Sequence, residues 1–311
     1  MIVAADAALW DQQYDLPLLE RLGPAQDEII AHVAQVNASI GVAAKPASTE
    51  VRADFHADVR AAMAGMPACV LALLDGVLLG VRFARQLGSS AISDIVASAE
   101  GVILGVVVAL DVDAFEQRTA NAWASWKENT PFTPVHGYRL EAQIAAPQDD
   151  HRQGALQYLL LHEFGHVLAA GRGLLPEWWN DAQAMRETDD YLYLPLAWRI
   201  TPEKEVVPLS GNDFPLRGDI AYYQAPRLAA SQMPDAYAQL RSANFATLYA
   251  ATSMHEDFAE SFASYVHAIM LGKPQCIRIH RDGKLLLQFD NYWEAGRSAA
   301  KRRLLEQLLG S

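Results

Sequence analysis

Two histidines and a glutamate stand close together in the sequence His162-Glu163-Phe164-Gly165-His166. Residues four apart lie on one face of a helix, so both imidazoles can bind the same metal ion. Glu163 lies about 100° around such a helix from His162, beside the ion without having to bind it. Its carboxylate can take a proton from water that zinc has acidified and pass it to a leaving amine. The motif therefore predicts a zinc site suited to hydrolysis.

A hydrolytic zinc site needs a third protein ligand and an open position for water. Metzincins place Gly three residues and His six residues after the second motif histidine, whereas this chain has Ala169 and Arg172 there. The stretch 255–262, with the sequence HEDFAESF, has apolar residues at helical spacing. Within it Glu256 can be the third ligand. Glu260, one turn later, can orient a ligand histidine through a hydrogen bond.

Three alternatives accompany this interpretation. Glu187 is a rival third ligand because it follows His166 by 21 positions, within one or two of the spacing in thermolysin-like enzymes. A second alternative keeps the zinc without catalysis, as in a regulatory or binding protein on a degenerate peptidase fold. A third has no metal, and the polar residues of two helices only fix the core. The intact Glu163 favours catalysis, since a pure binding module has no need of a general base.

The motif HEFGH, followed by E-x-F-A-E-x-F, resembles the gluzincin peptidases, in particular the group around the anthrax lethal factor catalytic domain and the pro-Pro endopeptidases. The Mlc-titration-factor family is a looser relative. The resemblance covers about residues 138–270 and implies an α+β zincin-like domain with Zn²⁺ and a peptide or protein substrate. It also implies that Glu256 is the metal ligand and that Tyr249, seven residues earlier, donates a hydrogen bond to the oxyanion. This chain departs from the group in one respect, because 90 positions separate Glu256 from His166.

The elements that position these residues can be predicted from periodicity. Residues 152–170 form a helix that is apolar nearly all round and is therefore buried on every side. Residues 138–145 alternate as a strand near a sheet edge, and 102–110 form a second strand. One of these two strands would be the edge along which a peptide pairs. A helix over 245–270 would carry Glu256 and form part of a helical lower half below a small mixed sheet.

The rest of the chain is assigned more coarsely. Helices are predicted over 25–36 and 51–63, and they make up an N-terminal segment, 1–66, packed on a catalytic domain, 67–311. Residues 171–242 are rich in Pro, Trp, Tyr and Asp and have weak periodicity, so they are predicted to be a long insertion, with some helix of its own, that can shape or cover the cleft. Asp-Gly pairs predict hairpins over the two remaining apolar segments, 69–81 and 276–289.

Several conspicuous residues are given structural roles. The terminal helix, 294–309, is predicted to expose a basic face, which comprises Arg297, Lys301, Arg302 and Arg303. His267 lies too far along the helix from Glu256 to join the same metal ion, and His255 has no evident role. The tryptophans of the insertion are assigned to the core rather than to a substrate platform; they are Trp178, Trp179 and Trp198.

Composition excludes several classes of protein. The formal net charge of −12 opposes nucleic-acid binding, which needs clustered Lys and Arg. Two cysteines cannot form a disulfide framework or a cysteine-based zinc site. The amino terminus lacks the basic and apolar regions of a signal peptide, and the apolar stretches are shorter than the roughly 20 residues of a membrane helix. We therefore expect a cytoplasmic protein with neither a membrane nor a nucleic acid as partner.

Overall fold

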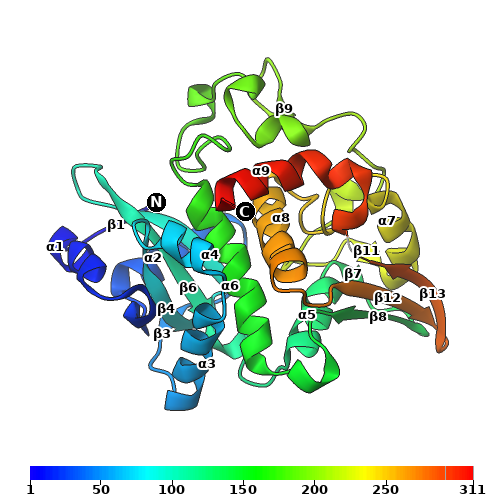
Figure 1. Ribbon diagram of the computed structural model, residues 1–311, viewed down its shortest axis with the longest axis horizontal. Coiled ribbons are helices and arrows are strands. Elements are labelled where there is room, and N and C mark those ends of the chain that lie inside the picture. Colours follow the sequence, from blue (N-terminus) through cyan, green and yellow to red (C-terminus); the bar gives the residue numbers. More distant parts are fainter. Residues whose placement is uncertain (291, 311) are drawn as a thin grey trace. The chain divides into compact units, whose positions relative to one another are not determined.

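The computed structural model describes residues 1–290 and 292–310 (Figure 1). It has α+β architecture with a mixed sheet, as the sequence predicts. The chain divides into two compact units, which we describe separately. Unit 1 comprises Met1–Thr119 and His151–Leu168, and unit 2 comprises Ala120–Asp150 and Ala169–Ser311. The predicted division into segments 1–66 and 67–311 stays a prediction.

Unit 1 is built on a sheet with the strand order β1-β5-β6-β4-β2, and a sixth strand, β3, pairs with β4. All pairs are parallel except β5 with β6 and β3 with β4. The strand predicted over 102–110 is confirmed as β6, but it lies between β5 and β4, so its predicted alternative role as a free edge is wrong. The six strands are β1 (Ile2–Val3), β2 (Leu22–Pro24), β3 (Ala47–Ser48), β4 (Leu78–Arg85), β5 (Ala91–Ala97) and β6 (Ile103–Asp111).

Helices cover both faces of this sheet. On one face α2 buries Ile29 and Val33 in an apolar cluster with residues of β4, β5 and β6. On the other face α3 places the Phe55 ring 6.2 Å from that of Phe83 in β4. Helix α6 joins this second layer, where Gln157 donates to a carbonyl of α3. The helices of unit 1 are α1 (Ala7–Asp11), α2 (Asp27–Ser39), α3 (Ala53–Ala64), α4 (Ala68–Leu74) and α6 (Arg152–Ala169).

The predicted helices over 25–36, 51–63 and 152–170 are confirmed as α2, α3 and α6. The hairpin predicted over 69–81 is wrong in its first half, because residues 68–74 are helix α4 and only the second half is a strand. Pro67 leads into this helix, and its buried residues Val70 and Leu74 are four apart. A short apolar run fits a strand or a buried helix equally well, and here the buried pair shows which period applies.

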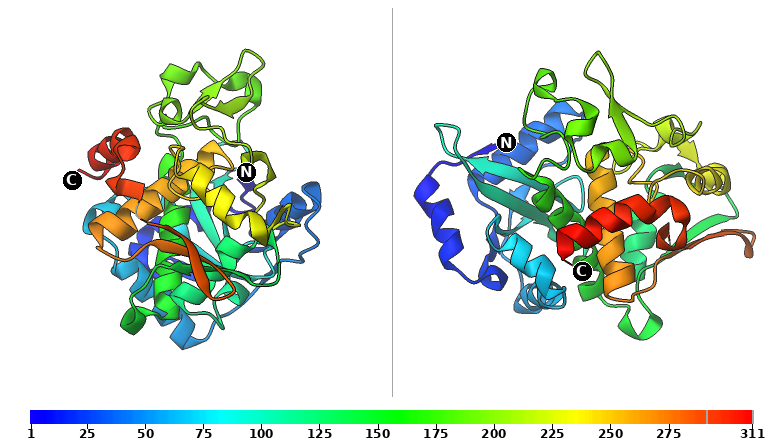
Figure 2. Two further views of the ribbon diagram at one scale, coloured as in Figure 1. Left: turned by 90° about the vertical axis from the view of Figure 1, so that its right-hand side faces the viewer. Right: turned by 45° about the horizontal axis from the view of Figure 1, so that its top comes forward.

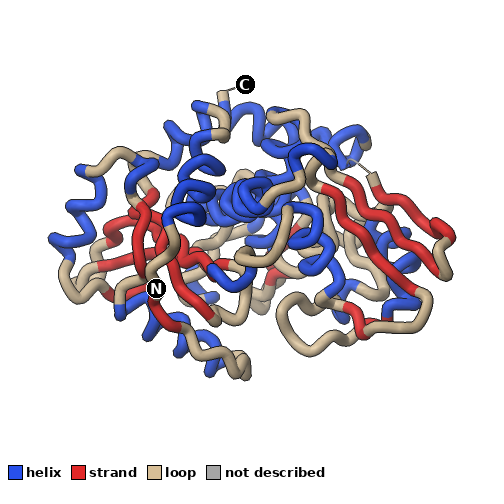
Figure 3. Tube along the Cα trace, turned by 90° about the horizontal axis from the view of Figure 1, so that it is seen from below, coloured by secondary structure: helices blue, strands red, loops and turns tan. Residues whose placement is uncertain are grey.

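Unit 2 contains an antiparallel sheet with the order β13-β12-β8 (Figure 3). The predicted strand over 138–145 is confirmed as β8 (Tyr138–Gln143), and it lies at the edge of this sheet. The predicted hairpin over 276–289 is confirmed as β12 (Cys276–Arg281) and β13 (Lys284–Phe289). Its turn residues Asp282 and Gly283 have φ of 49° and 77°, the left-handed values that a two-residue hairpin loop requires.

Helices of unit 2 flank this sheet, and α9 crosses α8 (Figure 2). They are α5 (Ala120–Asn129), α7 (Met233–Leu240), α8 (Met254–Tyr265) with a π-helical turn over Val266–Met270, and α9 (Ala299–Leu309). The segment 171–242 consists mainly of turns, with α7 as its longest helix, as predicted. Within this segment the short strands β9 (Trp198–Ile200) and β10 (Val206–Pro208) pair with each other, whereas β11 (Leu228–Ala229) pairs with β7 (Phe132–Thr133) outside it.

The basic face predicted for the terminal helix is wrong at Lys301. This side chain is fully buried, and its Nζ lies 2.5 Å from Oδ1 of Asp257 in α8. Arg303, two positions later, is exposed. The amphipathic pattern of this helix indicated that one of its faces is buried, but it did not indicate that Lys301 lies on that face.

Over the described residues, no single helix has the length and hydropathy to cross a membrane. Helices α3 and α4 reach those values only as a pair, and that pair is bent by 105°.

Candidate metal centre

Helix α6 brings the two motif histidines together. Nε2 of His162 lies 3.3 Å from Nε2 of His166, and their rings are nearly perpendicular with centroids 5.0 Å apart. His162 is buried and His166 is half-buried. Two nitrogens bound to one tetrahedral zinc at about 2.0–2.1 Å would lie roughly 3.3–3.4 Å apart. The two imidazoles thus have the separation that a shared ion requires.

Glu163 follows His162 and is itself buried, with 4% of its surface exposed. Its Oε2 accepts a hydrogen bond of 2.6 Å from the hydroxyl of Ser93 in β5. This contact fixes the carboxylate and partly compensates for its removal from water. Ser93 could not be predicted from the sequence, because a serine in a strand gives no local sign that it contacts a residue 70 positions away.

Strand β5, which carries Ser93, is paired with a neighbouring strand along one side but over only two residues along the other. On its inner side β5 pairs with β6 along its whole length, from Ala91 to Ala97. On its outer side, of the strands that the structure describes, only β1 pairs with it, and only at Val96 and Ala97. The outer backbone groups of β5 near Ser93 therefore have no strand neighbour within the described part of the chain. Ser93 on this strand contacts Glu163, and the sequence did not single out this edge.

Helix α8 carries the third candidate ligand. The predicted start near Phe245 is wrong, because the helix begins at Met254. Its N-cap is Ser253, whose hydroxyl accepts a hydrogen bond of 3.2 Å from the backbone N–H of Glu256. A serine in this position satisfies an N–H group that otherwise lacks a helical acceptor, and so it sets the boundary. Glu256 consequently lies in the first turn of α8.

Glu256 belongs to a group that could hold a metal ion. The ligand atoms of His162, His166 and Glu256 all lie within 4.8 Å of one another. Two imidazole nitrogens and one carboxylate oxygen are a donor set that zinc accepts in hydrolytic sites, where a fourth position stays open. The residues present therefore fit such an ion. The rival Glu187 lies outside this group; its side chain is 86% exposed and pairs with Lys204.

Tyr249 and Glu260 lie near Lys127 in unit 2. Oε1 of fully buried Glu260 accepts a 2.6 Å hydrogen bond from Lys127 Nζ, and Oε2 accepts one of 2.9 Å from Thr247. The predicted contact of Glu260 with a ligand histidine stays a prediction. Tyr249 lies in the turn before α8, not on the helix that the sequence predicted for it. Lys127 could not be predicted from the sequence, since no motif links it to residues more than 120 positions later.

Asp257, next to Glu256, links α8 to other parts of unit 2. Besides Lys301, its carboxylate accepts a hydrogen bond of 3.0 Å from Trp198 Nε1, and its carbonyl accepts one from Tyr193. Trp198 is thus a core residue, as predicted. Helix α9 and the segment 171–242 both meet α8 at this one carboxylate.

The remaining histidines of this region have structural partners. His267 is buried with its Nε2 3.1 Å from the carbonyl of Pro274, and burial lowers its pKa to about 4. His255 Nε2 lies 2.9 Å from the carbonyl of Pro176, and its ring contacts that of Trp178. Trp178 and Trp179 are half-buried, so they are less enclosed than the predicted core assignment implied.

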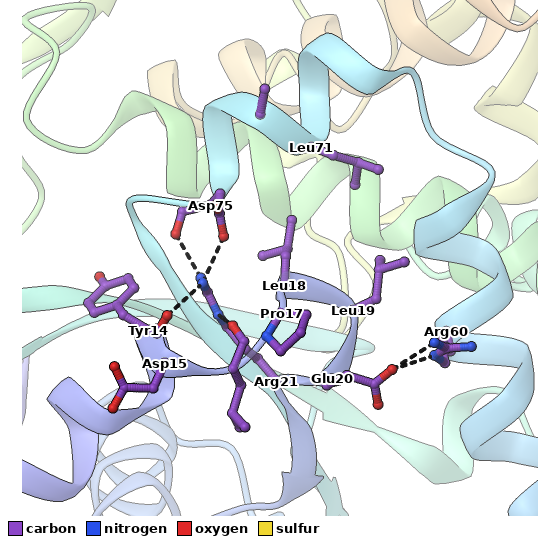
Figure 4. Close-up of a pocket in the computed structure, with 12 residues that line it drawn as sticks. Tyr14, Asp15, Pro17, Leu18, Leu19, Glu20, Arg21, Arg60, Leu71 and Asp75 are labelled. Carbon is purple, nitrogen blue, oxygen red and sulfur yellow. Dashed lines mark hydrogen bonds and ion pairs between the residues drawn. The ribbon is translucent and has the colours of Figure 1, made fainter.

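A hollow of about 630 Å³ lies elsewhere in unit 1, between residues 14–21 and the end of α4 (Figure 4). Four of the charged side chains that line it already pair with each other within the wall. The Arg21 guanidinium donates to Asp75 and to backbone carbonyls, and Arg60 pairs with Glu20. This hollow contains none of the candidate metal ligands.

The chain matches no protein-family model, no curated protein and no solved structure. Its function is therefore inferred from the residues and geometry of the site.

Proposed function

We propose that this protein is a zinc-dependent peptidase in which His162, His166 and Glu256 hold the metal ion and Glu163 is the general base. The observation that carries the proposal is the arrangement on α6, where two imidazole nitrogens lie 3.3 Å apart beside a buried carboxylate. Burying a histidine and a glutamate beside a second, half-buried histidine is costly for a helix that only fills a core. A metal ion would offset that cost, because it binds the imidazoles and attracts the carboxylate.

A bound zinc ion would acidify water and polarise the carbonyl group of a peptide bond. The chain contributes a proton acceptor at the Glu163 carboxylate. Because Ser93 already occupies Oε2, we assign the proton transfer to Oε1. That oxygen takes the proton of the attacking water and delivers it to the leaving amine.

The outer edge of β5 is the surface that we assign to the peptide. An extended substrate can pair with exposed N–H and C=O groups as an added strand, which aligns one peptide bond without reading its side chains. The sequence suggested β8 or β6 for this role. We favour β5 because Ser93 on this strand contacts Glu163 directly.

Tyr249 is assigned to the carbonyl oxygen of the substrate. A phenol donates a hydrogen bond that strengthens as negative charge develops on that oxygen in the transition state. The resemblance to the gluzincin peptidases implies this role for Tyr249, seven residues before Glu256, and the turn at Tyr249 leads directly into α8.

Digestion of a peptide library by the zinc-loaded protein tests the proposal. We expect cleavage by the wild type and a roughly 100-fold or greater loss in Glu163→Gln, whose amide cannot accept a proton, with zinc content unchanged. The matched control is Glu187→Gln, which alters an exposed glutamate and should keep full activity. A wild type that binds zinc and cleaves no peptide would favour the zinc-binding regulatory protein instead. Full activity in Glu163→Gln would place the general base elsewhere.

A further inference from the structure

A buried ammonium group lies against the ring of Tyr249. Lys127 belongs to α5, and 6% of its side chain is exposed. Its Nζ lies 4.8 Å from the centroid of the Tyr249 ring, within the distance of a cation–π contact. The same Nζ lies 2.6 Å from Oε1 of Glu260, one turn beyond Glu256 on α8. Lys127 thus contacts both Tyr249 and the helix of the third candidate ligand.

This lysine remains charged despite its burial. Removal from water alone would lower the pKa of the ammonium group, but the carboxylates of Glu260 and Glu128 raise it above its usual range. Glu260 is the closer partner, and Glu128 Oε1 is 3.8 Å away. An ammonium held in this way presents a permanent positive charge to the ring beside it.

Two further rings contact Tyr249. The Tyr222 ring lies 4.6 Å away, and its hydroxyl is fixed by a hydrogen bond of 2.8 Å to Glu128. The Tyr223 ring lies 6.3 Å away and nearly perpendicular. Tyr223 has φ of 59°, a left-handed conformation that is strained for an aromatic residue. Such strain persists where the surroundings require it, and here it coincides with the ring cluster around Tyr249.

Tyr249 needs such contacts because it is not part of a helix. It precedes the N-cap Ser253, and its own backbone carbonyl accepts hydrogen bonds from Thr252. These bonds fix the chain but leave the direction of the phenol to the side-chain contacts. Among the contacts described for this ring, the charge of Lys127 acts on it electrostatically and also links it to α8 through Glu260.

We propose that Lys127 is a positioning residue that fixes the ring of Tyr249, and with it the direction in which the phenol donates its hydrogen bond. Glu260 is its counter-ion, which keeps the ammonium in place. The consequence for catalysis rests on the proposed function, whereas the placement of the ring does not.

The placement can be tested in the metal-free protein by ¹⁹F NMR after labelling with 3-fluorotyrosine. The chain has 11 tyrosines, and the Tyr249 resonance is the one lost in Tyr249→Phe. We expect Lys127→Met to shift and broaden this resonance and Lys127→Arg to restore it in part. The control Lys284→Met removes an exposed lysine of unit 2 and should leave it unchanged. A Tyr249 resonance that is identical in Lys127→Met and wild type overturns the proposal.

Lys127→Met leaves the buried Glu260 carboxylate without its cation and can weaken folding. The variant Lys127→Met/Glu260→Gln removes both charges, and its amide keeps a donor and an acceptor for Thr247. We expect the same change in the Tyr249 resonance in this folded protein. If the resonance returns to its wild-type position in the double variant, the charge does not hold the ring and the proposal is wrong.

Kinetics then test the catalytic consequence. We expect Lys127→Met to lower kcat roughly 10-fold with little change in KM, the size expected for one partly buried cation–π contact. In a Tyr249→Phe background the same substitution should add no further loss, because no hydroxyl remains to be directed. An equal loss in both backgrounds overturns a role through Tyr249. Absence of peptide cleavage by the wild type would instead refute the proposed function, and the NMR result would still decide the placement.

Discussion

Helices α6 and α8 both carry buried ionisable side chains, but they hold them by different means. On α6, His162 and His166 meet each other within one turn of the same helix. On α8, Asp257 and Glu260 pair with lysines that lie 44 and 133 positions away in the sequence. Spacing along the chain therefore determines the chemistry of α6, whereas tertiary contacts determine the environment of α8.

The two helices also differ in the free energy that their buried charges require. An ion pair buried on both partners is strongly destabilising to break, because the remaining charge has no solvent to stabilise it. Helix α8 has two such pairs within four residues, Lys301 with Asp257 and Lys127 with Glu260. We infer that α8 is held rigidly by its surroundings, so that Glu256 is presented in a fixed position.

Loss of one α8 pair gives the largest effect that we predict. Lys301→Met should lower the free energy of unfolding by roughly 3–5 kcal/mol, since Asp257 stays buried without its cation. Arg303→Met is the matched control on an exposed position of α9 and should change it by less than about 0.5 kcal/mol. Urea unfolding of the three proteins measures this. Equal stabilities for the two variants would show that the pair does not anchor α8.

A smaller effect is expected at Tyr249, beside α8. Tyr249→Phe should lower kcat roughly 100-fold, because one hydrogen-bond donor to the oxyanion is lost, while zinc affinity stays the same. Tyr138→Phe, which alters a half-buried tyrosine of β8, is the control. Steady-state kinetics and a zinc titration measure the two quantities. Wild-type turnover in Tyr249→Phe would remove this residue from the proposed site.

The smallest effect concerns pH and His267, in the π-helical turn that follows α8. Burial, with a smaller effect of Lys273, lowers the pKa of His267 to about 4. The unfolded chain, with an ordinary histidine pKa of about 6.5, binds more protons between these values, so stability falls as pH drops through this range. This group should account for about 2 kcal/mol of the stability lost between pH 7 and pH 5.

The comparison of two variants isolates this contribution. His267→Gln should lose less stability between pH 7 and pH 5 than the wild type does, by about that amount. His136→Gln, at an exposed histidine, should show the wild-type dependence. Denaturant unfolding at the two pH values decides the matter, and parallel curves for wild type and His267→Gln would contradict the prediction.

The contrast between the two helices also explains what the sequence could predict. The bounds of α6, the face shared by His162 and His166 and the strand β8 follow from local periodicity, and they are confirmed. The choice of Glu256 over Glu187 followed from its apolar, helical context, from the resemblance to the gluzincin peptidases and from the spacing of Glu187, which is one or two positions off. Glu256 is the carboxylate grouped with the two histidines. Local patterns failed where a distant partner decides the outcome. Lys301 has the sequence context of a surface lysine, and its contacts with Asp257 and with the backbone carbonyl of Asn244 make it a core residue.

Ser93 and Lys127 show the same limit at the candidate site. Neither lies in a motif, and each acquires its role from a carboxylate far away in the sequence, Glu163 or Glu260. The start of α8 depended on Ser253, a cap within an otherwise apolar stretch that periodicity alone extends back to Phe245.

Zinc affinity across three variants tests the central claim most directly. Competition with a chromogenic chelator should show one tightly bound zinc per chain in the wild type and in Glu187→Ala, whose altered side chain is exposed. His162→Ala and Glu256→Ala should each lose more than the roughly 10- to 100-fold that is typical of residues that only support a ligand. A wild type that takes up no zinc would contradict the claim. So would a Glu256→Ala protein that keeps its zinc while Glu187→Ala loses it.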